Sequence, residues 1–152
     1  MNKPKFVYVT HIATTPERLW EALTSAEFIE QYWFGRKNES KWKKGAVIES
    51  RSPKGDLEWQ GKVLESKPPL RLSYTFDVVG EGEPPSRVIF EIEPLGRNTH
   101  PQGRAVRFTV THEGFLLDSK IFPGICEGWP AILSGLKSLL ETGRSLELTW
   151  KE

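Results

Sequence analysis

The chain has 152 residues, 38% of them apolar, which is typical of one globular domain with a single core, here expected over residues 1–152. Its 21 Lys and Arg nearly balance its 20 Asp and Glu, so the net charge of +1 predicts no nucleic-acid or anionic-membrane partner. The single cysteine, Cys126, excludes an internal disulfide and favours a reducing compartment. No apolar run approaches the ~18 residues of a membrane-spanning helix, and the first residues lack the apolar segment of a secretion signal. We therefore expect a cytoplasmic protein without membrane insertion.

The first elements are a strand and a short helix. Residues 5–12, KFVYVTHI, alternate and are rich in β-branched and aromatic side chains, which predicts a strand. Thr14 and Glu17 then have the spacing of a capping box, with Pro16 in the first helical turn. A short helix should follow, because Leu19 and Leu23 lie on one helical face.

A second short helix is predicted in SAEFIEQYWFG, residues 25–35, which ends in three consecutive aromatic residues. Successive helical residues point about 100° apart, so three neighbours cannot share one buried face. Tyr32 and Trp33 fall on the same stripe as Phe28, whereas Phe34 falls outside it. Gly35 suits a left-handed turn that ends the helix. We expect Phe34 to be redirected inward by that turn or to lie exposed at a rim.

Five further strand patterns follow, separated by turn residues: residues 45–52, 57–66, 70–79, 87–94 and 104–114. Apolar residues alternate with Arg, Ser, Thr and Glu in several of them, as in RVIFEIEP. This pattern is typical of an antiparallel sheet with one face in water. Residues 124–143 then predict one long amphipathic helix that ends at Gly143, with Pro130 either in its first turn or at a kink.

The order of elements constrains the architecture. Six strands at ~4.8 Å spacing make a sheet about 24 Å wide, whereas one helix is only ~10–12 Å across. One helix cannot cover such a face, so the sheet must curl around it, and large side chains must fill the remaining space or leave a hollow. We predict an α+β fold of the helix-grip type: a curved antiparallel six-stranded sheet around a long C-terminal helix, with two short helices after the first strand.

Four segments resemble the proteins similar to the activator of the heat-shock protein 90 ATPase, within the START-like SRPBCC superfamily: residues 13–35, 71–77, 111–115 and 128–143. They fall in the family's order and extend over nearly the whole chain. The resemblance implies the same helix-grip fold, commonly with an apolar cavity. It leaves the function open, because relatives of this fold range from lipid carriers to cyclases and co-chaperones.

The aromatic residues are the best candidates for lining a cavity between sheet and helix. The alternative for each is ordinary core packing. The predicted lining residues are Tyr8, Trp33, Phe34, Trp59, Tyr74, Phe76, Phe90, Phe108, Val110, His112, Trp129 and Leu133.

His112 is the one polar candidate in this set. Strand parity puts it on the apolar face, where it would anchor a ligand's polar group or be a core histidine bonded to a neighbour. His11 should lie towards the other end of the paired strands, so we expect no shared metal site. No cluster has metal-ligand spacing and no nucleophile motif is present, so we assign no catalytic residue, metal or cofactor.

We hypothesise non-enzymatic binding of a small hydrophobic or amphipathic ligand. One alternative is a co-chaperone-like interaction module that stimulates an ATPase, with a chaperone or other protein as partner. Another is a cavity enzyme, a cyclase or hydrolase. A wide exposed apolar patch on the outer sheet would favour the first alternative, and a strongly perturbed acid or histidine in the cavity would favour the second.

Overall fold

The computed structural model describes residues 3–95 and 104–147. Its elements in chain order are β1 (Phe6–Ile12), α1 (Pro16–Thr24), α2 (Ala26–Tyr32), β2 (Lys37–Glu39), β3 (Val47–Arg51), β4 (Leu57–Lys67), β5 (Arg71–Val78), β6 (Ser86–Leu95), β7 (Ala105–Glu113) and α3 (Phe122–Thr142). The strands form one antiparallel sheet in the order β1-β7-β6-β5-β4-β3-β2. His100, one of the three histidines of the chain, lies outside the described residues.

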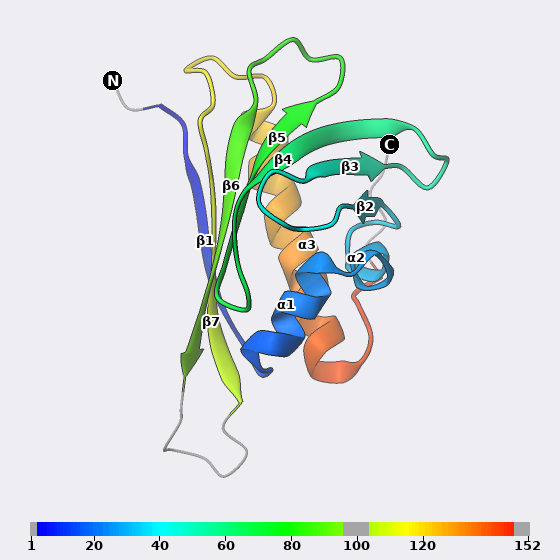
Figure 1. Ribbon diagram of the computed structural model, residues 1–152, viewed down its shortest axis with the longest axis vertical. Helices are drawn as coiled ribbons and strands as arrows, with labels where there is room; N and C mark the ends of the chain where they lie inside the picture. The colour runs from blue at the N-terminus through cyan, green and yellow to red at the C-terminus, as the bar shows by residue number, and fades with distance from the viewer. Residues whose placement is uncertain (1–2, 96–103, 148–152) are drawn as a thin grey trace.

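The sheet curves around α3, and α1 and α2 lie at one end of the space between them (Figure 1). The predicted helix-grip fold is confirmed. The long helix buries one face, as its periodicity predicted. Its buried apolar side chains are Trp129, Ile132, Leu133, Leu136 and Leu139. None of the helices within residues 3–95 and 104–147 is long and apolar enough to cross a membrane.

The sheet has seven strands, where the sequence predicted six. The additional strand, β2, has only three residues, KNE, and therefore shows no apolar alternation. It pairs with β3, and its central residue Asn38 is buried. The Ser50 hydroxyl donates to Asn38 Oδ1 at 2.6 Å, which satisfies both buried polar groups. Polar pairing of this kind leaves no sequence periodicity to detect.

Strand β4 carries a register irregularity that favours bending of the sheet. Its register with β5 shifts between Val63 and Glu65, and bulges of this kind increase the local twist and bend the strand. Gly61 lies just before this shift. A Cβ at Gly61 would lie 1.9 Å from the carbonyl oxygen of Thr75, so only glycine allows the two backbones to approach this closely.

The long helix ends at Gly143, as predicted, but the N-terminal ends of the helices differ from the predicted ones. Thr15, not Thr14, caps α1, and its Oγ1 accepts from the Arg18 N–H at 3.1 Å. The N-cap of α2 is Ser25, which makes no side-chain cap bond. The third helix begins at Phe122, so Pro130 lies inside it, not in its first turn.

Candidate functional site

A cleft of about 270 Å³ lies between the first half of α3 and the β4–β5 part of the sheet. Aromatic and branched apolar side chains form most of its wall, and one charged pair forms its rim. The lining residues are Trp33, Arg36, Glu58, Trp59, Phe76, Val78, Ile121, Gly124, Ile125, Gly128, Trp129 and Ile132. This volume is nearly twice that of the ~150 Å³ apolar cavity that takes up benzene.

Three tryptophans and a phenylalanine form the apolar wall. Trp59 and Phe76 lie on neighbouring strands with ring centroids 4.5 Å apart. Trp33, directly after α2, packs edge-on against Trp129 of α3 at 5.3 Å and lies 6.2 Å from Trp59. Each ring is fixed by another, so the wall is preformed.

Two helical glycines leave the α3 side of the cleft open. Gly124 and Gly128 are one turn apart, and a Cβ built at either residue would meet no atom within 4 Å. A glycine inside a helix costs about 1 kcal/mol relative to alanine. At these two positions the helix backbone itself borders the cleft, and no side chain fills it.

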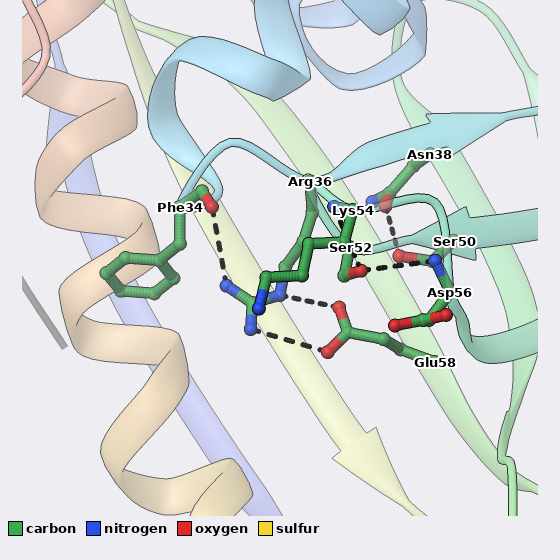
Figure 2. Close-up of polar contacts among 8 residues, drawn as sticks. All are labelled: Phe34, Arg36, Asn38, Ser50, Ser52, Lys54, Asp56 and Glu58. Carbon is green, nitrogen blue, oxygen red and sulfur yellow. Dashed lines mark hydrogen bonds and ion pairs between the residues drawn. The ribbon is translucent and has the colours of Figure 1, made fainter. Parts of the chain in front are cut away.

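Arg36 and Glu58 form the polar rim (Figure 2). Arg36 Nε donates to Glu58 Oε1 at 2.7 Å and Nη2 donates to Oε2 at 3.4 Å. Arg36 Nη1 also donates to the Phe34 carbonyl at 3.4 Å. Phe34 (φ 51°) and Gly35 (φ 72°) are both left-handed, and this turn after α2 brings Arg36 to the cleft.

The structure brings four of the twelve predicted lining residues together at the cleft: Trp33, Trp59, Phe76 and Trp129. Six others are buried in the core, namely Tyr74, Phe90, Phe108, Val110, His112 and Leu133. Tyr8 is half-buried and stacks on Phe6 at the far edge of the sheet. Phe34 is half-buried under the Arg36 guanidinium, 5.8 Å from its ring centroid, and borders a smaller hollow with Tyr32.

His112 is fully buried and hydrogen-bonded on both ring nitrogens. The Trp129 indole N–H donates to Nδ1 at 3.0 Å, and Nε2 lies 2.7 Å from the Ser86 hydroxyl. Because an indole can only donate, Nδ1 must accept and Nε2 must carry the proton. Burial lowers the pKa of His112 to about 3, so the ring stays neutral. Of the two interpretations left open by the sequence, this geometry corresponds to the core histidine, one side chain behind the cleft.

Sequence reasoning missed the rim and the glycines. Arg36 and Glu58 are 22 residues apart, and nothing in either segment indicates the other. Gly124 and Gly128 did carry a signal, because two glycines one turn apart are costly in a helix unless space is needed beside them.

A second depression, of about 460 Å³, differs in chemistry. It is lined by Trp20 and Trp42 but also by Lys41, Lys43 and Lys44, which are exposed. Its lining combines the two indole rings with three ammonium groups, so we regard the apolar cleft as the candidate site. Among the residues that the structure describes, no three His, Cys, Asp or Glu side chains come together in a group that could hold a metal ion.

The geometry so far is that of a helix-grip fold with an apolar cleft. The family model described as Activator of Hsp90 ATPase homolog 1-like protein matches residues 13–141. The chain belongs to this family. No curated protein sequence matches the chain significantly.

Several solved structures are similar to this chain over most of its length. Protein MLL2253 from Mesorhizobium loti is 28% identical with a TM-score of 0.75, covering 90% of this chain and 96% of that chain. The Aha1 dimer from Colwellia psychrerythraea is 17% identical with a TM-score of 0.71, and the match covers 93% of this chain and 99% of that chain. An HSP90 activator from Plasmodium falciparum is 17% identical with a TM-score of 0.63, and the match covers 81% of this chain and 84% of that chain. The two less identical structures show a shared fold alone.

Proposed function

We propose that the protein binds a small, largely apolar molecule in the cleft between α3 and the β4–β5 part of the sheet, without chemical conversion. The observation that carries this proposal is the open space of about 270 Å³ lined by Trp33, Trp59, Phe76 and Trp129. Water in this open cleft finds few hydrogen-bond partners on the tryptophan and phenylalanine rings, so a ligand that displaces the water is favoured. A ligand that fills the cleft gains about 25 cal/mol per Å² of apolar surface buried, less its ordering costs.

The ionisable groups give less support to the enzyme alternative. Arg36 and Glu58 are the ionisable side chains of the cleft among the described residues, and they bind each other. His112 has the perturbed pKa that would suit catalysis, but both of its ring nitrogens are engaged in the core.

The alternative of a co-chaperone-like module is supported by the family and by the HSP90 activator among its structural relatives. The surface of the protein supports this alternative less well than the cleft supports ligand binding. Over the described residues, the outer face of the sheet carries cross-strand ion pairs such as Arg71–Glu91 and Arg107–Glu93. Val7 and Val9 of the edge strand β1 are exposed, each by about half.

A neutral fluorescent probe tests the proposed function directly. N-phenyl-1-naphthylamine should brighten on binding and saturate at one molecule per chain. Gly128→Trp should abolish this signal, because a side chain at residue 128 has the open cleft before it. Gly128→Ala is the matched control: it adds only a Cβ, and should retain binding and stabilise the helix by about 0.5–1 kcal/mol. Unchanged saturable binding by a folded Gly128→Trp protein would contradict the proposal.

A further inference from the structure

The rim of the cleft places a cation and an anion side by side. Arg36 and Glu58 are about one-third exposed, at 31% and 35%, and both line the cleft. Figure 2 shows the guanidinium held between the Glu58 carboxylate and the Phe34 carbonyl. A ligand lying against the tryptophans would present one end to this pair.

The Arg36 guanidinium is fixed in position but retains donor capacity. Its contacts to Glu58 and to the Phe34 carbonyl use three N–H groups. A guanidinium has five N–H donors, so donors remain for an acceptor on a ligand. Since the left-handed turn at Phe34 and Gly35 sets its position, Arg36 does not need to be ordered by the ligand.

Glu58 determines which acceptors the rim tolerates. A ligand carboxylate within hydrogen-bond distance of Arg36 would also lie close to the Glu58 carboxylate, which already compensates the arginine charge. Like charges at this spacing repel, more strongly beside an apolar wall than in water. A hydroxyl avoids this repulsion, because it accepts from Arg36 and donates to Glu58.

We propose, on the basis of the proposed function, that the ligand is an uncharged molecule of about two rings in size that carries a hydroxyl group directed at Arg36 and Glu58. Glu58 is then the residue that determines specificity by excluding anionic ligands such as fatty acids. The apolar body lies between the backbone of α3 at Gly124 and Gly128 and the rings of Trp59 and Phe76.

Two matched probes test this specificity. At pH 7, 2-naphthol is uncharged, because a phenolic pKa is about 10, whereas 2-naphthoate is ionised. Titration calorimetry on the wild-type protein should give at least tenfold tighter binding of 2-naphthol. Glu58→Gln keeps the shape of the side chain but leaves the Arg36 charge uncompensated. The affinity for 2-naphthol relative to that for 2-naphthoate should therefore fall at least tenfold. Glu93→Gln is the control, because Glu93 pairs with Arg107 on the outer face of the sheet.

The outcomes separate this inference from the proposed function. Equal or tighter binding of 2-naphthoate by the wild-type protein, blocked by Gly128→Trp, would overturn the inference and leave the cleft as a binding site. An unchanged ratio in a folded Glu58→Gln protein, checked by its melting temperature, would also overturn it. If neither probe binds the wild-type protein, the inference and the ligand-binding proposal both fail.

Discussion

The indole N–H of Trp129 donates to Nδ1 of His112 at 3.0 Å, and this bond joins the cleft to the core of the sheet. One face of the tryptophan lines the cleft, and its polar edge is held by a buried histidine of β7. The histidine in turn bonds the Ser86 hydroxyl, which donates to the Phe76 carbonyl at 3.3 Å. The cleft wall is therefore positioned by a polar chain across three strands and α3.

The first prediction concerns pH and stability. Burial lowers the pKa of His112 to about 3 in the fold, while the unfolded side chain keeps its ordinary value near 6.5. The unfolded state therefore binds the proton first. The stability that the neutral His112 contributes is complete above about pH 6.5 and is lost as the pH falls towards 3. Between pH 7.5 and pH 5 we expect the free energy of unfolding to drop by about 2 kcal/mol.

Urea unfolding at the two pH values measures this drop. His11→Gln should leave this drop in stability unchanged, since the His11 side chain is exposed on the solvent-facing side of β1. His112→Gln should reduce it, because the titrating group is gone. A wild-type protein of equal stability at pH 5 and pH 7.5 would contradict a neutral, buried His112.

The second prediction concerns the packing of the long helix α3 against the sheet. Leu136 of α3 is completely buried. Leu136→Asp should unfold the protein, because an uncompensated buried charge costs about 3–5 kcal/mol against a total stability of ~5–15 kcal/mol. Leu136→Met, which conserves volume, should cost less than about 1.5 kcal/mol. Circular dichroism melts compare the two variants, and a Leu136→Asp melt within a few degrees of wild type would refute this packing.

The third prediction concerns the bend in β4. Gly61→Ala forces a Cβ against the Thr75 carbonyl oxygen, so the strands must separate. The Lys62 N–H bond to the Thr75 hydroxyl, 2.9 Å long, should weaken with it. We expect a loss of about 1–3 kcal/mol or more in chemical denaturation. Lys62→Ala, at the exposed neighbour, should change stability by less than about 0.5 kcal/mol, and equal effects of the two substitutions would argue against a close approach at Gly61.

The periodicity of the sequence predicted the fold because each large element buries one face. Alternation identified the longer strands, and the apolar stripe from Ile125 to Leu140 identified α3. The strand β2 was missed because its stability comes from pairing with β3 and from the Asn38–Ser50 bond, not from an apolar face. Parity therefore finds strands that face a core, and overlooks short polar edges.

The cleft was predictable in part, for a physical reason. Parity shows which face a side chain occupies, but not how far along the sheet the filled core ends and the open space begins. Phe76 and Phe108 share the inner face, yet only Phe76 reaches the cleft. The Arg36–Glu58 pair depends on a turn after α2 and on the approach of a distant strand, which no local pattern encodes.

The most direct test of the central claim is to locate a bound ligand by NMR. Titration of 2-naphthol into ¹⁵N-labelled protein should shift the indole N–H signals of Trp33, Trp59 and Trp129, which line the cleft. The indole signals of Trp20 and Trp42, which line the lysine-rich depression, should stay in place. Shifts confined to Trp20 and Trp42, or no saturable shift in any indole signal, would contradict a ligand site in the cleft between α3 and the sheet.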